Sequence, residues 1–129
     1  MAAKTMRERL FEYAAERYGA QPEYLWERTP QHGVLRRRDN EKWFAVIMLL
    51  DGSKIGREKG VIYDIVNIKC SPLMTGSLLA MKGIVPAYHM NKENWVSVLL
   101  DGSVEETQVM SLLDMSYELA RQSGKAVRR

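Results

Sequence analysis

The chain has 129 residues, of which 46% are hydrophobic and 27% are charged, so its length suits one compact domain and is short for two. No unbroken apolar run approaches the length of about 20 residues that spans a bilayer, and charges interrupt the first ten residues, where a signal peptide needs an apolar core. The net charge of +3 and the pI near 9.1 favour an anionic partner.

The cysteine and motif content argues against redox, metal and catalytic chemistry. Cys70 is the single cysteine, so no intramolecular disulfide can form, and no paired Cys and His spacing suggests zinc. Residues 51–56 contain a lysine and two glycines but lack the Gly-Lys-Ser/Thr ending of a phosphate-binding loop. We therefore expect a cytoplasmic, non-enzymatic protein with no catalytic residue, no metal and no cofactor.

A helix is expected to open the chain. Thr5 and Glu8 have the spacing of a capping box, in which the threonine hydroxyl and the glutamate each bond a free backbone amide. Apolar residues then recur at spacings of three and four, up to Gly19 and Pro22, which stop a helix. The pattern predicts a helix from about Met6 to Tyr18.

The middle of the chain is expected to form strands and one short helix. Segments 34–38, 43–50 and 61–68 are rich in β-branched and aromatic residues and are bounded by turn residues. Ser71 and Pro72 form a good helix start, which predicts a helix over residues 73–81. Two more strands are expected at 85–90 and 95–100.

A last helix is expected after Ser103, which forms a second capping box with Glu106 and precedes an apolar pattern of helical period. The periodic pattern ends at Gly124, and a basic, flexible tail is expected from about residue 123. We expect a single domain over residues 1–129 with an α+β fold. Its order is α-β-β-β-α-β-β-α, with helices packed on an antiparallel sheet of about five strands.

Two basic segments are candidates for contacts with phosphate. Residues 36–38 are three consecutive arginines, and strand alternation places Arg36 and Arg38 on one side and Arg37 on the other. Lys42 follows beyond a short turn, and the segment 52–60 brings three more cations. Two basic β-loops are suited to gripping DNA phosphates, although charged residues also protect an exposed edge strand from aggregation.

The turn over residues 88–95 is the other candidate. His89, Asn91 and Lys92 can bond or stack against a ligand, and Lys92 can meet a phosphate. The same residues also make a good β-turn, so a binding role and a structural role both stay open for them. For Tyr88, Met90 and Trp95 the structural role is favoured.

The run Tyr88-His89-Met90-Asn91-Lys92, followed by Trp95, resembles the signature of the YjbR (MmcQ) family of small bacterial proteins. Lys42-Trp43-Phe44 and Asn67-Ile68-Lys69-Cys70 extend the resemblance. It implies the element order given above and a DNA-binding role, since the family is commonly labelled as DNA-binding. Members often carry histidine just before the tryptophan, where this chain has Asn94.

The resemblance and the charge pattern together give a set of candidate nucleic-acid contacts. They are Arg36, Arg37, Arg38, Lys42, Lys54, Arg57, Lys59, Lys69, His89, Asn91 and Lys92. The alternative is a protein-interaction or chaperone-like adaptor, because the element order also resembles that of small bacterial secretion chaperones. An enzyme acting on a small ligand comes third. We expect a monomer whose partner is DNA or another protein.

Overall fold

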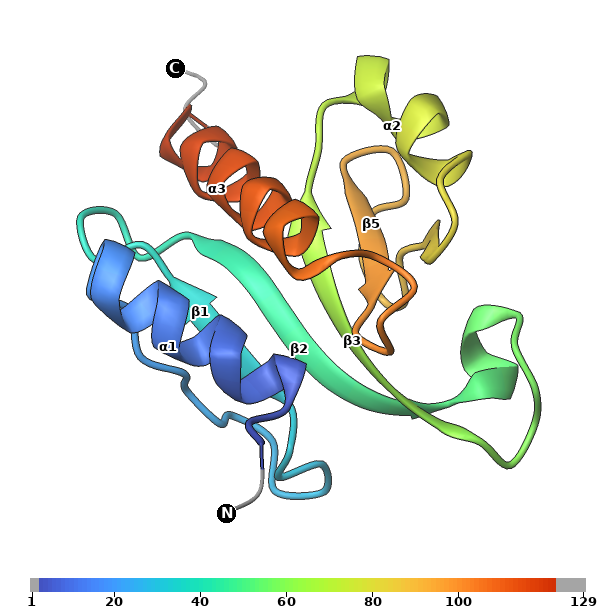
Figure 1. Cartoon of the computed structure of the whole chain (residues 1–129). Helices are drawn as coiled ribbons and strands as arrows, with labels where there is room; N and C mark the ends of the chain where they lie inside the picture. The colour runs from blue at the N-terminus through green and yellow to red at the C-terminus, as the bar shows by residue number, and fades with distance from the viewer. Residues whose placement is uncertain (1–2, 123–129) are drawn as a thin grey trace.

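The computed structural model describes residues 3–122 and confirms the expected α+β fold, with the element order α-β-β-β-α-β-β-α (Figure 1). The antiparallel sheet has five strands in the order β1-β2-β3-β5-β4. The basic tail expected from about residue 123 lies outside the described residues. The elements are α1 (Met6–Tyr18), β1 (Gly33–Arg36), β2 (Trp43–Asp51), the 3-10 helix η1 (Gly52–Ile55), β3 (Ile62–Lys69), α2 (Pro72–Leu79), β4 (Ile84–Pro86), β5 (Trp95–Leu99) and α3 (Glu106–Gln122).

Helix α1 begins and ends where its capping residues predict. The Thr5 hydroxyl accepts from the Glu8 amide at 3.1 Å, and the Thr5 amide donates to the Glu8 carboxylate at 2.8 Å. Gly19 ends the helix in the left-handed conformation, with φ of 69°, and its amide donates to the carbonyl of Ala15. The predicted capping box is therefore confirmed.

Helices α1 and α3 cover one face of the sheet and lie in front of it in Figure 1. Leu10 from α1 and Leu113 from α3 are fully buried in one hydrophobic cluster with strand residues such as Ile47 and Val66. This cluster is the larger of the two in the described chain. The burial of these apolar side chains is the main force that holds the helices on the sheet.

The opposite side of the sheet, which we call the second face, has its own apolar cluster. It contains Val46, Met48, Ile65 and Leu99, because strand side chains point alternately to the two faces. Ile55 from η1 packs on this cluster, as do side chains from residues 88–90. The second face is thus covered by a 3-10 helix and an irregular turn instead of an α-helix.

Helix α3 begins later than the capping pattern predicts. The Ser103 hydroxyl and amide both donate to Asp101, at 2.5 Å and 3.0 Å, so the hydroxyl does not cap a helix. The first helical bond is from the Val109 amide to the Glu105 carbonyl. The predicted second capping box is therefore wrong, because an aspartate two residues upstream competes for Ser103.

The expected strand over residues 85–90 is also shorter than predicted, because β4 ends at Pro86. Residues 87–94 form an irregular segment, which we call the signature turn. Within it His89 has a φ of 61°, a left-handed conformation that is uncommon for residues other than glycine. Tyr88 and Met90 still pack on the second-face cluster, while His89 is exposed.

Candidate functional site

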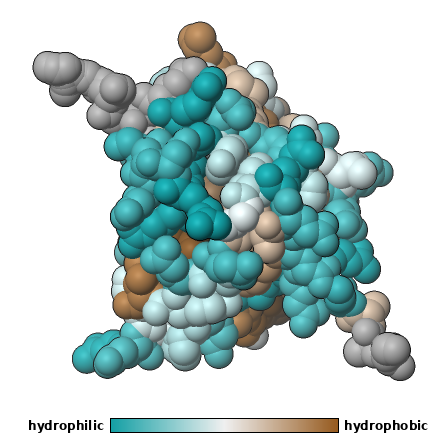
Figure 2. Space-filling model, turned by 90° about the vertical axis from the view of Figure 1, so that its left-hand side faces the viewer, coloured by the Kyte–Doolittle hydropathy of each residue, from teal (hydrophilic) through white to brown (hydrophobic). Residues whose placement is uncertain are grey.

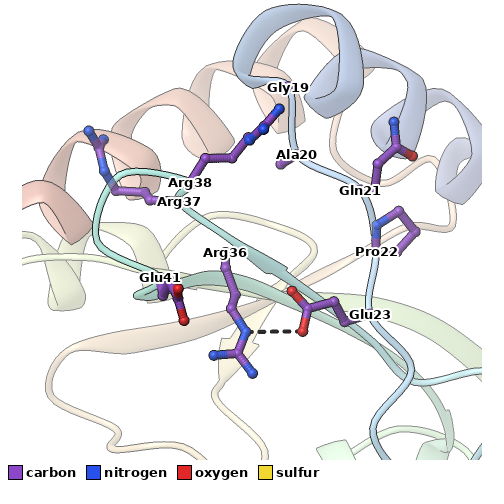
Figure 3. A pocket seen from close by; sticks show the side chains of 9 residues that line it. All are labelled: Gly19, Ala20, Gln21, Pro22, Glu23, Arg36, Arg37, Arg38 and Glu41. Atoms are coloured by element: carbon purple, nitrogen blue, oxygen red, sulfur yellow. Dashed lines mark ion pairs between the residues drawn. The ribbon is translucent and has the colours of Figure 1, made fainter.

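The three consecutive arginines point in different directions (Figure 3). Only Arg36 belongs to β1. Arg37 is buried and donates to the carbonyl of Tyr117 in α3 at 2.9 Å, with its guanidinium 4.0 Å from the centre of that ring. Arg38 extends past the end of α1 toward Gly19. The prediction that Arg37 lies apart from its two neighbours is consistent with this arrangement.

The charge of Arg37 is used inside the fold. Its guanidinium makes two bonds to the Asp39 carboxylate, at 2.9 Å and 2.6 Å. This hydrogen bonding raises the pKa of Arg37 and lowers the pKa of Asp39. Arg37 therefore ties the β1–β2 turn to α3 and is poorly placed to meet a phosphate.

All three arginines line a hollow of about 560 Å³ beside the end of α1, although the Arg37 guanidinium is bound to α3. Glu23 and Glu41 also line it, and the Arg36 Nε atom lies 3.2 Å from the Glu23 carboxylate (Figure 3). The side of the molecule that carries α1 and the β1–β2 turn is largely hydrophilic (Figure 2). The two carboxylates offset the arginines, so this hollow is a weak anion site.

The two basic loops do not lie side by side. The β1–β2 turn precedes β2 and the segment 52–60 follows it, so they lie at opposite ends of this strand (Figure 1). Eight residue steps at about 3.3 Å separate the ends by about 26 Å. DNA gripped by both loops would therefore have to span the length of β2, and this expectation stays a prediction.

A row of cations and aromatic rings crosses one end of the second face. The Arg36 guanidinium lies 6.0 Å from the Trp43 ring centre, and the Lys69 ammonium lies 4.7 Å from the Trp95 ring centre. Register pairs Arg36 with Trp43 and Lys69 with Trp95, on four adjacent strands. We call these four residues the cation–aromatic row.

Lys69 is half-buried in this row. Burial lowers the pKa of Lys69, and the nearby charge of Lys42 lowers it further. Each of these lysines therefore disfavours the charged form of the other, since like charges repel. Within the described chain neither lysine forms an ion pair with a carboxylate. An incoming anion would relieve this repulsion.

The signature turn is held mainly by its own polar groups. The Lys92 ammonium donates to the Ala87 carbonyl at 2.5 Å, and the Asn91 carboxamide accepts from the amides of Glu93 and Asn94 at 2.8 Å and 3.2 Å. These bonds are consistent with a structural role for Lys92 and Asn91 in closing the turn. A side chain that closes a turn can still meet a ligand, so their binding role stays a prediction.

A cleft of about 490 Å³ opens over the second face. Its floor includes Met48 and Leu50 of β2. Trp26, Thr29 and His32 line it together with Tyr88 and His89 of the signature turn, and Lys54 and Asp51 are also among its lining residues. Both histidines of the chain therefore lie in one cleft.

Sequence reasoning missed the contribution of Trp26, Thr29 and His32. They belong to an irregular segment between α1 and β1 that has no helical or strand period. A tryptophan and a histidine close together in such a segment were the available signal. The Trp26 ring lies 6.3 Å from the His32 ring and 6.0 Å from the Trp43 ring, edge to face in both cases.

Nine of the eleven candidate residues fall into three groups in the described structure, while Arg37 is bound to α3 and Arg38 lines the hollow beside α1. Lys42, Lys69 and Arg36 lie at one end of the second face, and His89, Asn91 and Lys92 lie in the signature turn. Lys54 borders the cleft, with Arg57 and Lys59 further along the same loop. Over residues 3–122 no group of three or more His, Cys, Asp or Glu side chains could hold a metal ion. None of the described helices is long and apolar enough to cross a membrane.

These features define a small α+β protein with a cleft and a row of cations on the second face of its sheet, opposite helices α1 and α3. The chain belongs to the YjbR family, whose model matches residues 15–119. YyaQ of Bacillus subtilis is 36% identical over 115 residues, which cover 89% of this chain and 98% of YyaQ. YjbR of Escherichia coli is 39% identical over 56 residues, covering 43% of this chain and 48% of YjbR. Both are named as uncharacterized proteins, so their names supply no activity.

Solved structures agree with the fold. A crystal structure of a Pseudomonas syringae protein has a TM-score of 0.86 and 39% identity, covering 89% of this chain and 98% of that one. A Deinococcus radiodurans protein, whose domain is designated DUF419, has a TM-score of 0.68 and 21% identity, covering 95% of this chain and 82% of that one. The second likeness shows the fold alone.

Proposed function

We propose that this protein binds the phosphate backbone of nucleic acid on the second face of its sheet, and that it acts by binding instead of catalysis. The observation that carries the proposal is the distribution of unpaired cations. Lys42 and Lys69 at one end of the second face, and Lys54 and Lys59 at the other, form no ion pair with a described carboxylate. Phosphate binding draws its affinity from such groups, because they release counterions when they meet a phosphate.

The cations of the helix layer are different. Lys4, Arg7, Arg9 and Arg17 each form an ion pair with a carboxylate, for example Arg9 with Glu106 at 2.7 Å. A cation that is already paired binds a phosphate less strongly, because the carboxylate must be displaced or its negative charge repels the phosphate. This contrast favours the second face over the helix layer as the interface.

The separation of the two ends suits a nucleic-acid strand. A backbone repeats its phosphates along a line, so one ligand can meet cations about 26 Å apart that a compact anion cannot. The signature turn lies between them, where His89 and Asn91 offer hydrogen bonds. In this proposal Arg57 and Arg38 are outlying contacts, Arg36 is shared with Glu23, and Arg37 and Lys92 position the two turns.

The test compares two double variants by the change in fluorescence anisotropy of labelled duplex and single-stranded DNA at low salt. Lys42→Gln with Lys69→Gln removes two charges from the second face. Arg9→Gln with Arg17→Gln removes two charges from the helix layer and is the matched control. We expect at least a tenfold loss of affinity in the first pair and little change in the second. Equal losses in the two pairs would contradict the proposed location.

A protein partner is the second candidate function, and an exposed apolar helix favours it. In α2 the residue Leu73 is 95% exposed, and Met74 and Leu79 are also exposed. We propose that the protein is a monomer in isolation, which sedimentation can test. A concentration-dependent dimer that Leu73→Glu abolishes would mean that a second copy covers this helix.

A further inference from the structure

We propose that the cleft on the second face binds one unstacked nucleobase, with the phosphate attached to its sugar directed toward Lys54. This inference rests on the proposed function for its biological setting, but the cleft can be tested separately. It narrows the ligand class, because a base paired and stacked in a duplex cannot enter a cleft, whereas a base of a single strand or a free nucleotide can.

The cleft has the shape and chemistry that a flat, partly polar ring requires. Its volume of about 490 Å³ lies in the usual range for small-ligand sites. Met48 and Leu50 give it an apolar floor, and the rings of Trp26 and Tyr88 stand among its lining residues. Aromatic side chains of this kind stack with bases of any sequence, because every base has a π-face.

The orientation of Trp26 is restricted by two neighbouring rings although the residue is 36% exposed. Its edge-to-face contacts with His32 and Trp43 hold the indole at 6.3 Å and 6.0 Å between ring centres. An exposed ring that is already oriented loses little conformational freedom when a ligand stacks on it. This favours a binding role over that of a loosely attached surface residue.

Polar groups along the cleft can bond the edge of a base. The His32 Nε2 atom lies 3.3 Å from the Leu49 carbonyl oxygen, and because a carbonyl only accepts, Nε2 carries the hydrogen. In the neutral ring the Nδ1 atom is then left as an acceptor. The Thr29 hydroxyl, which has no partner within the described chain, can donate or accept.

The charges near the cleft favour a phosphate at one end. Lys54 has no ion pair among the described residues, and His89 lies in the same lining. Asp51 is the one carboxylate of the lining, and its oxygens accept from the Ser53 amide at 2.9 Å, the Ser53 hydroxyl at 2.6 Å and the Gly60 amide at 2.8 Å. These bonds, and then the charge of Lys54, lower the pKa of Asp51, so the carboxylate stays ionised and its oxygens are held within the loop 51–60.

The position of His89 supports a built site. Its φ of 61° is a conformation that costs free energy for a residue with a side chain, and such positions cluster at functional sites. Its ring lies 4.1 Å from the Tyr88 ring, at 61° to it. The imidazole is therefore held at the cleft by a backbone conformation that a merely structural turn would fill better with glycine.

The experiment is an NMR titration that follows the three indole N–H signals and the two histidine rings. The probes are thymidine 5′-monophosphate and a short oligothymidylate, and a DNA duplex serves as comparison. We expect the mononucleotide and the oligothymidylate each to shift the Trp26 and His89 signals. The mononucleotide should leave the signal of the buried Trp95 nearly unmoved, whereas oligothymidylate also shifts it by binding at Lys69, which lies over the Trp95 ring. We also expect Trp26→Ala to weaken the binding of the mononucleotide about tenfold, because the substitution removes the ring on which its base stacks.

Matched variants separate the cleft from its surroundings. Tyr24→Ala removes an exposed ring outside the cleft, and Lys59→Gln removes a cation of the same loop outside the lining. In the titration with thymidine 5′-monophosphate, neither should reproduce the effects of Trp26→Ala and Lys54→Gln. With oligothymidylate only Tyr24→Ala serves as the control, because Lys59 is a phosphate contact of the proposed interface. His89→Gly provides a second cleft variant, because glycine accepts the left-handed backbone and the fold is kept.

The outcomes distinguish the inference from the proposed function. Binding of the mononucleotide in the cleft without binding of any DNA supports the inference and contradicts the proposed function. Binding of oligothymidylate that depends on Lys42 and Lys69 but not on Trp26, with Trp26 and His89 signals unmoved, overturns the inference and keeps the proposed function. If neither the mononucleotide nor oligothymidylate shifts the Trp26 and His89 signals, the inference is overturned.

Discussion

Asn67 and Ser97 face each other across β3 and β5, and together they hold the backbone of Tyr88 at the start of the signature turn. The Asn67 amide donates to the Tyr88 carbonyl at 3.1 Å, and the Tyr88 amide donates to the Ser97 hydroxyl at 3.2 Å. The Ser97 hydroxyl in turn donates to the Asn67 carbonyl oxygen. Both side chains are fully buried, so this closed set of bonds fixes the turn from inside the protein.

Asn67→Leu should therefore destabilise the protein strongly. The substitution keeps a similar volume but leaves the Ser97 hydroxyl and the Tyr88 carbonyl without their partner in a buried site. Unsatisfied groups of this kind cost about 1–3 kcal/mol each, so we expect a loss of about 3 kcal/mol in a urea unfolding experiment. Gln21→Leu, at an exposed position, is the control. A loss as small as that of the control would show that the bonds do not hold the turn.

The left-handed backbone at His89 predicts that glycine is tolerated better than alanine at this position. His89→Gly should make the protein more stable than His89→Ala by about 1 kcal/mol, because glycine adopts a φ near 61° without a steric penalty while alanine does not. Thermal unfolding of the two variants measures the difference. Equal stability would mean that the left-handed conformation is not maintained in solution.

Alanine substitutions at Thr5 and Ser103, which precede α1 and α3, should lower the stability of the protein by unequal amounts. Thr5→Ala should lower the free energy of unfolding by about 1 kcal/mol, because the hydroxyl caps α1. Ser103→Ala should cost less, since the Ser103 amide keeps its bond to Asp101 and no helix amide loses a partner. Unfolding of both variants in denaturant tests this order, and a larger loss for Ser103→Ala would contradict it.

The elements were largely predictable from the sequence because each has a local cause. The capping box at Thr5 and the β-branched run of β2 act within a few residues, so pattern alone places them. The start of α3 was not predictable, because Ser103 has two competing partners and only the folded loop decides between them. The irregular backbone at His89 depends on Asn67 and Ser97, which are distant in sequence.

The candidate site was predicted only as a set of residue types. Charge identified Lys42 and Lys54, but not that β2 separates their loops by its whole length. The role of Arg37 was hidden for the same reason, since its partner Tyr117 lies 80 residues further along the chain. The cleft could not be foreseen, because Trp26 and His89 meet there only through the tertiary fold.

Alkaline pH should destabilise the protein through Tyr18. Burial, and then the hydrogen bond to Asp114, raises the pKa of Tyr18 far above its ordinary value of 10.0. The folded state therefore keeps a proton that the unfolded state loses, so this contribution is complete below pH 10 and declines as the pH rises above it. The loss is at most roughly 1 kcal/mol per pH unit.

The comparison that tests this effect is between the original chain and Tyr18→Phe, unfolded at several pH values above 9. Lys69, whose pKa is lowered by burial and by Lys42, acts with the opposite sign in both proteins and cancels. We expect the difference in stability between the two proteins to shrink as the pH rises past 10.0. A difference independent of pH would show that Tyr18 titrates normally.

The most direct test of the proposed second-face interface is the salt dependence of nucleic-acid binding. With contacts from Lys42, Lys54, Lys59 and Lys69, a plot of log affinity against log salt should have a slope of about −3 to −4. Lys42→Gln with Lys69→Gln should flatten the slope by about 1.4 to 1.8 units, while Arg9→Gln with Arg17→Gln leaves it unchanged. A slope that the lysine pair does not change, or no binding at low salt, would contradict the account.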